Sequence, residues 1–591
     1  MWPTIMMLVF LHATVCFRVS SIKVPCNRTD SSSVEPLVPI QNFTTYTLDN
    51  CDTMITFSSN QSISNVQVIA NGGNVTPSVF VTGRVLEEVR IGLYDIVSQP
   101  PPTEPPVWFK LLSFIGTSTA SSLAVAHNIV VRVSNTTLSN YQGDLVYIGA
   151  PIVDGFILIL EDSDFTYAQM AETSVYLYGR QIGTNAEFIG ASVSNVKMTQ
   201  IGGRWNVTVH SYNRTMGFWS IFGYLTTTNV EFVVQETTTI LTFSHEVSIN
   251  ITIDKYCLQV IDVTDPGNLI NFATTLTDFT FVNTMEMDPR VEDCTTDFRI
   301  LFLSASGADE PPNVNVSNVA ISVSNAKFTM FGANQGLMFQ YRGYSHISSA
   351  SFVAENVSST VIAQGLSADS ARSTVLLIYV IVAQLTNWSF IARNILFHGE
   401  LNHANKLEYY SSSTGCLLLL QNAQTEIGVV DILNASVDAV VNERTVGNVL
   451  GVGVLMNQFA VTLSLVVFLS SVSTTVSIDI KDSVINTHGT VVGPYFSGLA
   501  TVFVNYVALC VGVVVMQNNC TSCNISLLRT NINASKTYIL PPDSPSAWPI
   551  TDNMICNVLS SLNITAFVIG IDPSIVIQTC LIPNMEFLKN F

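Results

Sequence analysis

A short pattern of apolar and polar residues recurs nine times along this 591-residue chain, and it constrains the fold more than any other feature. Each copy has eight residues. Most copies place apolar residues at positions one, three and eight, and all have Asn or Asp at position five. The copies are VRVSNTTL (from Val131), LILEDSDF (Leu158), ASVSNVKM (Ala191), TTLTDFTF (Thr274), ISVSNAKF (Ile321), FVAENVSS (Phe352), FIARNILF (Phe390), VDILNASV (Val430) and IDIKDSVI (Ile478).

The spacing of the apolar residues in this pattern predicts a strand that bends. Side chains alternate between the two faces of a strand, so positions one and three face one way and position eight faces the other. All three reach one core only if the chain loses a step of alternation between positions three and eight. Asn and Asp are the non-glycine residues that best tolerate the left-handed backbone of such a corner. We therefore expect position five to be the corner.

Repeated units of strand, corner and strand bury their apolar side only by stacking on one another. Apart from one gap of 83 residues between Ala191 and Thr274, the copies start at irregular intervals of roughly 27 to 48 residues, which is of the order expected for one coil with loops of variable length. The chain is also rich in Val, Ile and Thr, the residues that favour strands. The sequence therefore predicts an all-β fold, a parallel β-helix or β-solenoid with capping regions. A tandem array of β-sandwich domains is the alternative, and it predicts turn signals every 8 to 12 residues, as is typical of sandwiches.

Asn or Asp corners between short Val- and Ile-rich strands resemble the right-handed parallel β-helix of the pectin-lyase-like superfamily. The resemblance covers about Val131 to Ile532 and lies in the pattern alone. The N-terminal leader and the many glycosylation sequons are similar to large surface-glycoprotein families of protists. For an enzyme of this superfamily, the resemblance implies Asn-Thr-Asp, paired Asp, Gly-His-Gly and Arg-Ile-Lys strings, and this chain has none of them.

Proline-rich segments and the ends of the chain suggest four regions. Residues 1–21 hold an apolar segment, Ile5 to Phe17, that is typical of a signal peptide cleaved after Cys16 or Ser21. SQPPPTEPP (98–106) and PPDSPSAWP (541–549) are typical of loops or linkers, because proline lacks the amide that a ladder needs. We expect an N-terminal β cap or small β domain at 22–106, a β-solenoid at 107–540 and a C-terminal cap at 541–591.

Two features indicate export to a secreted or extracellular surface location. Beyond Cys16 the chain has an even set of ten cysteines, for which sequence neighbours suggest disulfides between Cys26 and Cys51, Cys257 and Cys294, and Cys556 and Cys580. Glycosylation sequons occur from end to end. They are at Asn27, Asn42, Asn60, Asn74, Asn135, Asn206, Asn213, Asn250, Asn315, Asn356, Asn387, Asn434, Asn519, Asn524, Asn533 and Asn563.

The apolar segment from Leu499 to Met516 is long enough to be a transmembrane candidate. We interpret it as a pair of buried strands instead. Sequons at Asn434 and Asn519 flank it on both sides, no basic residues mark a cytoplasmic edge, and its Val, Thr and Tyr content suits strands. A membrane-spanning chain remains a third reading, in which sequons on the two sides of the segment would not both carry glycans.

Charge and motifs argue against several functions. The net charge is -19, only 11% of residues are charged, and no basic run suggests nucleic-acid binding. DSDF at Asp162 fits a corner with a solvent-facing neighbour, Asp164. HGELNH, with His398, Glu400 and His403, fits an exposed loop, and THG at Thr487 fits a turn. CTSC, from Cys520 to Cys523, lacks the context of a redox or zinc motif and fits structural disulfides.

We expect from these features a secreted or cell-surface glycoprotein with a structural, adhesive or binding role, whose partners are carbohydrates or surface proteins. No catalytic residue, cofactor or metal ligand is predicted. The alternative is a carbohydrate-active β-helix enzyme, a polysaccharide lyase or hydrolase, which would show stacked Asp, Arg and aromatic side chains along one face.

Overall fold

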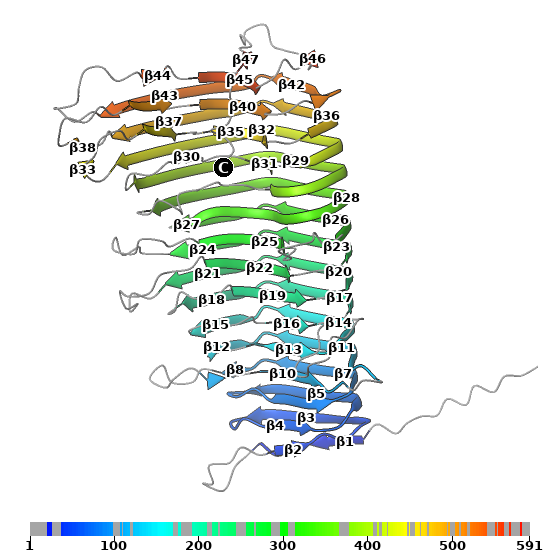
Figure 1. The fold of residues 1–591 in the computed structure, drawn as a ribbon. Coiled ribbons are helices and arrows are strands. Elements are labelled where there is room, and N and C mark those ends of the chain that lie inside the picture. Colours follow the sequence, from blue (N-terminus) through cyan, green and yellow to red (C-terminus); the bar gives the residue numbers. More distant parts are fainter. Residues whose placement is uncertain are drawn as a thin grey trace, which may run out of the picture.

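Strands are the only regular elements in the described part of the computed structural model. Nearly all of them stack into one elongated column of coils (Figure 1). The structure describes residues 20–26, 37–98, 107–108, 110–118, 122–142, 144–168, 175–178, 192–209, 216–222, 225–243, 256–264, 268–284, 296–304, 314–331, 333–365, 378–405, 411–412, 417–421, 423–445, 448–449, 455–460, 463–469, 472–492, 495–496, 503–507, 510–516, 520–539, 550–551, 554–560, 567–568 and 579–581.

Each coil contains a central strand that pairs in parallel with the central strands of the coils before and after it. In chain order these strands are β3 (Thr44–Cys51), β5 (Ile63–Gly73), β7 (Val85–Tyr94), β11 (Val125–Ser134), β14 (Ile152–Glu161), β17 (Ser192–Ile201), β20 (Thr226–Gln235), β23 (Asn268–Thr277), β26 (Val314–Ser324), β28 (Ala333–Gly365), β29 (Ile378–Asn405), β32 (Gln424–Thr445), β36 (Val472–Lys481) and β42 (Asn524–Leu528).

A leading strand precedes the central strand in each coil. These strands are β2 (Leu37–Pro39), β4 (Thr56–Ser59), β6 (Ser78–Gly83), β10 (Leu112–Gly116), β13 (Val146–Gly149), β16 (Val175–Tyr178), β19 (Met216–Phe222), β22 (Tyr256–Thr264), β25 (Thr296–Ser304), β31 (Leu418–Gln421), β35 (Leu463–Leu469), β40 (Cys510–Met516), β45 (Met554–Ser560) and β47 (Thr579–Leu581). The first parts of β28 and β29 continue the same column, because β25 pairs with β28 and β29 pairs with β31.

A trailing strand follows the central strand. These strands are β8 (Val97–Ser98), β12 (Thr137–Gln142), β15 (Asp164–Ala168), β18 (Arg204–Val209), β21 (Thr238–Phe243), β24 (Thr280–Thr284), β27 (Lys327–Phe331), β37 (Val484–Val492) and β43 (Asn531–Ile539), with the last parts of β28, β29 and β32. Of the remaining short strands, β9 (Val107–Trp108) pairs with the trailing strand β12, whereas β1 (Ser20–Lys23), β41 (Cys520–Thr521) and β46 (Phe567–Val568) pair with the central strands β3, β36 and β42.

Two small parallel sheets lie outside the main network. One contains β30 (Ser411–Ser412), β34 (Leu455–Ala460), β39 (Phe503–Val507) and β44 (Ile550–Thr551), and the other contains β33 (Asn448–Val449) and β38 (Tyr495–Phe496). Every described strand pairing is parallel. This confirms the predicted parallel β-solenoid, and the alternative of tandem β-sandwiches is wrong, because sandwiches are built from antiparallel sheets.

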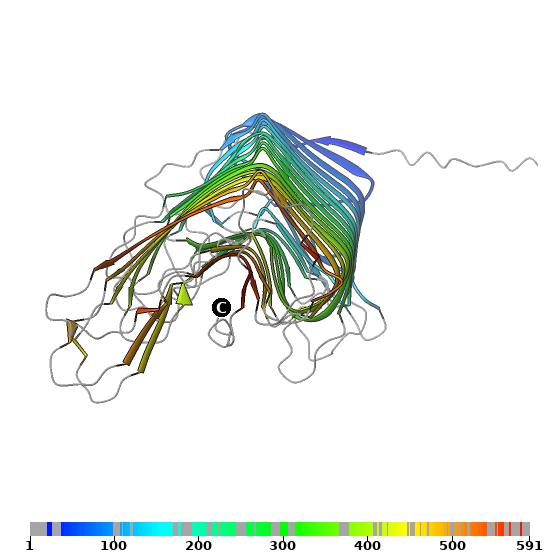
Figure 2. The ribbon, with the colours of Figure 1, turned by 90° about the horizontal axis from the view of Figure 1, so that it is seen from above.

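Two corners with left-handed backbone conformation bound the central strand in every coil. The eight-residue pattern predicted only one corner in each copy. Seen along the stack, the central strands run straight between two bends, and the trailing strands leave from the sharper one (Figure 2). The first corners are Phe43, Asn65, Glu88, Asn128, Gly155, Asn195, Asn229, Asn271, Asn318, Ser349, Asn387, Ile427, Thr475 and Ser522. The second corners are Asn50, Gly72, Asp95, Asn135, Asp162, Gly202, Glu236, Asp278, Asn325, Asn356, Asn394, Asn434, Asp482 and Arg529.

The two corners of a coil are always seven residues apart, although the first corners of successive coils are 22 to 48 residues apart. All the variation in coil length therefore lies outside the central strand. The corner residues have φ between 44° and 73°. All nine predicted corner residues are among them, which confirms the corner prediction. Eight of the nine are second corners, and Asn195 is a first corner.

The core lies inside the coil, and the corners explain how apolar residues reach it. Ile129, Val131 and Val133 are the first, third and fifth residues after the corner Asn128, and all three are buried. Beyond the second corner Asn135, alternation restarts one step out of phase, so that Thr136 and Leu138 also point inward. This is the lost step that the sequence predicted.

Side-chain sizes in neighbouring coils compensate for one another inside this core. Trp388 lies in register between Ala350 in the coil before and Gly428 in the coil after. A methyl group on Gly428 would overlap the indole ring of Trp388. The largest side chain of this column is thus flanked by the two smallest, as close packing requires.

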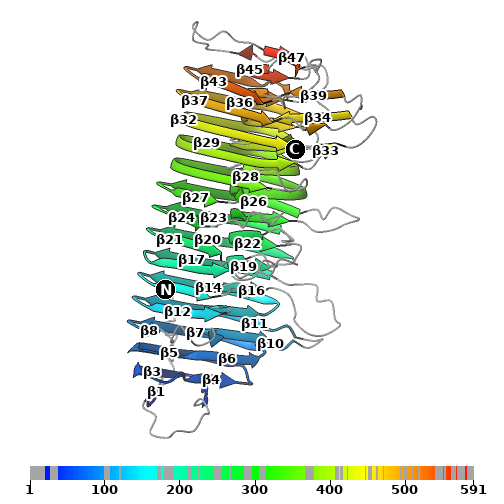
Figure 3. The same ribbon diagram turned by 90° about the vertical axis from the view of Figure 1, so that its left-hand side faces the viewer.

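Parallel pairing extends beyond the predicted limits of the solenoid at both ends (Figure 3). In the region 22–106, predicted as a cap or small β domain, β3 pairs with β5, β5 with β7, and β7 with β11, all in register. These strands carry the first three pairs of corners. In the region 541–591, β45 and β47 pair onto β40. The residues of both proline-rich segments, apart from Ser98, lie outside the described part of the chain.

Candidate functional site

The outward surface of the central strands, which we call the central face, is the most regular surface of the molecule. It consists of the second, fourth and sixth residues after each first corner, so it has three side-chain columns and fourteen coils. Constant strand length and in-register pairing make these columns continuous from β3 to β42. Such a surface presents one side chain per coil in each column, about 4.8 Å apart.

Stacked side chains bond the corners of successive coils to one another. In the first ladder, Nδ2 of Asn229 donates to Oδ1 of Asn195 at 3.0 Å, Nδ2 of Asn271 to Asn229 at 2.9 Å, and Nδ2 of Asn318 to Asn271 at 2.9 Å. In the second ladder, Nδ2 of Asn394 donates to Asn356 and Nδ2 of Asn434 donates to Asn394, both at 2.8 Å. These exposed amides hold the coils in register, so the predicted Asn corners have a structural role.

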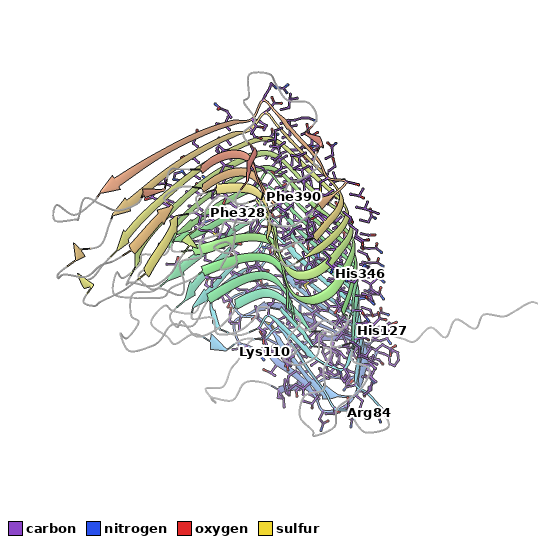
Figure 4. The ribbon with its side chains drawn as sticks, turned by 45° about the horizontal axis from the view of Figure 1, so that its top comes forward. Arg84, Lys110, His127, Phe328, His346 and Phe390 are labelled. Carbon is purple, nitrogen blue, oxygen red and sulfur yellow. A yellow bond between two sulfur atoms is a disulfide. The ribbon has the colours of Figure 1, made fainter. Side chains whose placement is uncertain are left out.

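A cluster around Asp154 replaces the ladder where its first corner is Gly155. Oδ1 of Asp154 accepts hydrogen bonds from Oγ of Ser194 and Nδ2 of Asn195, both at 2.7 Å, and Oδ2 lies 3.1 Å from Nδ1 of His127. Burial acts to raise the pKa of the Asp154 carboxyl, but the hydrogen bonds from Ser194 and Asn195 and the neighbouring His127 outweigh it, so this pKa lies below its ordinary value. Figure 4 shows His127 at the outer edge of the coils.

Two acidic residues stack in the fourth position of the central face, in the coils of β32 and β36. Asp431 pairs in register with Asp479, and each has a basic neighbour. Nη2 of Arg393 lies 3.4 Å from Oδ2 of Asp431, and Nζ of Lys481 contacts Oδ2 of Asp479. This is the arrangement of stacked Asp with Arg that the enzyme alternative requires. The aromatic part is missing, since the one aromatic residue at an outward position of the central face is Tyr94, in the coil of β7.

The motifs that the sequence singled out have different outcomes. Asp162 is a corner and Asp164 is exposed, as expected. The loop expected at HGELNH is wrong, because His398, Glu400 and His403 lie in β29, whose trailing part pairs with β32 as far as Asn405. Nδ1 of His398 is 2.9 Å from Oδ2 of Asp438 in the next coil. The turn expected at THG is also wrong, since 487–489 lie within β37.

The cysteines support part of the disulfide prediction. Cys26 and Cys51 form a disulfide with their Cα atoms 4.7 Å apart, as predicted. In the CTSC motif, Cys523 is buried and disulfide-bonded, in agreement with a structural role. Cys556 lies in β45, and Cys580, in β47, stands opposite Leu559. The pairs Cys257 with Cys294 and Cys556 with Cys580 stay predictions, and Cys294 lies outside the described residues.

The sequons occupy several kinds of position. Asn27, Asn213, Asn250, Asn519 and Asn563 lie outside the described residues. Asn42, Asn60, Asn74, Asn315 and Asn524 are exposed, Asn206 is half-buried, and Asn533 lies in β43. The remaining four, Asn135, Asn356, Asn387 and Asn434, are corner residues. Glycosylation at all sixteen stays a prediction.

Sequence reasoning missed the first ladder and the Asp154 cluster, although a signal for the ladder is present. Asn residues stand seven positions before an Asn or Asp in several coils, as in Asn128 with Asn135, Asn271 with Asp278 and Asn318 with Asn325. The predicted strand pair in 499–516 is borne out by β39 and β40. Within the described ranges no helix could cross a membrane, and no three His, Cys, Asp or Glu side chains gather closely enough to hold a metal ion.

Comparison of the chain with protein-family models, with curated proteins and with solved structures gives no match. The fold and the side-chain geometry therefore carry the functional argument alone.

Proposed function

We propose that this chain is a secreted or cell-surface glycoprotein whose solenoid acts as a structural or adhesive rod, presenting its variable loops to carbohydrates or surface proteins. The observation that carries the proposal is the pair of corner columns, which run through fourteen coils from Phe43 to Arg529 and are tied by Asn ladders from Asn195 to Asn318 and from Asn356 to Asn434. A column held by repeated nearest-neighbour contacts is a means of spanning distance, because its length grows with each coil while its cross-section stays constant. The Asn corners also favour a pectin-lyase-like β-helix as its finer classification.

Export is the second part of the proposal, and the structure near the N-terminus favours one of the two cleavage positions. The amide of Ser20 donates to the carbonyl of Phe43 at 3.1 Å, and its hydroxyl lies 2.8 Å from that of Thr44. Cleavage after Cys16 leaves these contacts and all of β1 intact. Cleavage after Ser21 removes half of the strand.

Expression of the full chain in eukaryotic cells tests this proposal. We expect the protein in the medium, beginning at Phe17, with a mass that falls on enzymatic removal of N-linked glycans and with the Cys26–Cys51 disulfide present. A chain lacking residues 1–16 is the control and stays inside the cell. Retention of the full chain in the cytosol, with no glycan and reduced thiols, would overturn the proposal.

The stacked Asp431 and Asp479 beside Arg393 favour one other function, a polysaccharide-cleaving enzyme. This hypothesis predicts that the chain cleaves an acidic or neutral polysaccharide and that Asp479→Asn abolishes the cleavage. The assay is run both with and without Ca²⁺. Asp164→Asn, an exposed change on the trailing side, is the matched control and keeps the activity. Absence of cleavage across a panel of polysaccharides rules out the enzyme.

A further inference from the structure

We propose that the central face is the interface of a homodimer in which two copies of the chain pack central face against central face. The first observation is charge. The whole chain has 24 basic and 43 acidic residues. The outward positions of the central face have five basic residues, Arg90, Arg132, Lys197, Arg393 and Lys481, and six acidic ones, Asp49, Glu161, Glu231, Glu355, Asp431 and Asp479. The acidic excess therefore lies almost wholly elsewhere.

This distribution decides how two copies can approach each other. Like charge over most of the molecule repels a second copy, and such repulsion keeps highly charged proteins apart. The central face is the surface on which that repulsion nearly vanishes. The inference does not depend on export, but it requires that the face carry no glycan: Asn524 is a sequon at an outward position of the face, and the sequons Asn135, Asn356, Asn387 and Asn434 are corners at its edges. The test therefore uses the chain without N-linked glycans.

Most charges on the central face are already compensated within one chain. Arg132 lies 2.7 Å from Glu161, Lys197 lies 2.8 Å from Glu231, and Arg393 lies 3.4 Å from Asp431, each pair joining neighbouring coils. Ion pairs that exist before docking do not need a charged partner. The coils of β23 and β26 have no charge at all on this face, where they present Ala273, Thr275, Thr277, Ala320, Ser322 and Ser324.

Apolar side chains stand exposed on the same face. Ile157 is 36% exposed, Ile201 is 37% exposed and Val429 is 46% exposed. Single exposed aliphatic side chains are normal on soluble proteins, so the charge and the area of the face carry the inference and these residues add apolar area to it.

The shape and area of the central face also suit a second copy. Seven-residue strands at about 3.3 Å per residue and fourteen coils at about 4.8 Å per coil give a surface of roughly 1,400 Å². About 800 Å² per partner is usual for a stable interface, so contact over little more than half of the face is enough. Sheets that pack face to face lie about 10 Å apart with their strands turned by about 30°, and the straight central strands permit this (Figure 2).

Sedimentation analysis of the purified full chain tests the dimer. We expect a dimer that becomes tighter as salt is raised, because salt screens the repulsion between the acidic remainders of the two copies. Thr275→Arg combined with Ser322→Arg puts uncompensated positive charge on the uncharged coils of both copies. We expect this variant to raise the dissociation constant by about tenfold or more, since opposed like charges are strongly unfavourable at an interface.

The matched control is Thr280→Arg combined with Thr329→Arg, which adds the same two charges in the same two coils on the trailing strands β24 and β27. It should leave the dimer unchanged, and both variants should unfold at the temperature of the unmodified chain. A chain that is monomeric at every concentration overturns the proposal. So does a dimer that survives Thr275→Arg with Ser322→Arg, or a monomer that instead binds a neutral polysaccharide through this face.

Discussion

Corner residues decide the fold at the smallest scale, because each holds a backbone conformation that costs most L-residues free energy. Asn tolerates the left-handed region, and its amide stacks on the amide of the coil before, as between Asn271 and Asn229. Eleven of the 28 corners are neither Asn nor Asp. Ile427 is the sharpest exception, since it is β-branched, has φ of 50° and is 59% exposed. Register with Asn387 and Thr475 holds it in this conformation.

Ile427→Asn should therefore stabilise the protein. An L-residue in the left-handed region costs about 1 to 2 kcal/mol that Asn largely avoids, so the free energy of unfolding should rise by about that amount. Chemical denaturation measures it. Val429→Asn is the control, because Val429 is exposed in the same strand but has no positive φ, and its effect should stay within about 0.5 kcal/mol. Equal effects of the two changes on the free energy of unfolding would show that the backbone of Ile427 is not strained.

The side chain of Asp154 makes the stability of the protein depend on pH. Its pKa lies below the ordinary value in the folded protein, so its contribution to stability is complete above the pKa of the unfolded chain and is lost as pH falls through the folded pKa. Asp154→Asn should lower stability at neutral pH and flatten the loss of stability below about pH 4, the ordinary range of Asp. Acid denaturation of both proteins measures this. Parallel acid curves for the two would show that Asp154 has no such role.

At the scale of the strand, the seven-residue distance between corners is the constant of the fold. The central strand must present three residues inward and three outward between two fixed bends, and a change of one residue would exchange the two sets. Leading and trailing strands have no such limit, so loops of different length enter the coil beside them. The coil length varies from 22 to 48 residues for this reason.

One serine inserted after Thr275 should therefore prevent folding or destabilise the protein by more than about 4 kcal/mol, because Leu276 would leave the core. The same insertion between β22 and β23 should cost little, since lengthening the connection between two strands by one residue adds little closure entropy. Secretion yield and thermal unfolding report both outcomes. Tolerance of the first insertion would contradict the fixed distance.

Much of the strand architecture could be predicted from the sequence, because Asn and Asp corners leave a chemical mark. All nine predicted corners have positive φ. Corners such as Phe43, Ile427 and Arg529 could not be found this way, since their side chains do not favour the conformation and only neighbouring coils impose it. The loop expected around His398 failed for a related reason. Alternating polar residues after a corner look like a loop in the sequence, but pairing with β32 extends the strand.

For the whole molecule, stability is a sum over neighbouring coils, so the end coils, which have one neighbour, unfold most easily. The described disulfide cysteines that follow corners lie near these ends, in the first and the last coil of the run of corner pairs. Cys51 directly follows the corner Asn50 in the first coil, and Cys523 directly follows the corner Ser522 in the last. The corner Ser522, like Thr475 in the coil before, has no amide to stack, and the disulfide of Cys523 adds a covalent bond next to it.

We expect Cys520 to be the partner of Cys523. Cys520 precedes the corner Ser522 by two residues, and its backbone is in register with Ser473, which is buried. Peptide mapping without reduction should recover the two cysteines in one cross-linked CTSC fragment. Cys523→Ser should then free the thiol of Cys520 and no other. Finding Cys523 joined to Cys510, Cys556 or Cys580 would contradict this pairing.

Because the distance between corners is fixed, the length of the molecule can change only in steps of one whole coil. Removing residues 319–349 would take out one complete turn, from just after one first corner to the next, and would bring Asn318 into the place of Ser349 with every later residue still in frame. The shortened protein would differ from the original by one step of about 4.8 Å along its axis. Reach could thus be reset by duplication or loss of a turn, while the surface that meets a partner keeps its pattern.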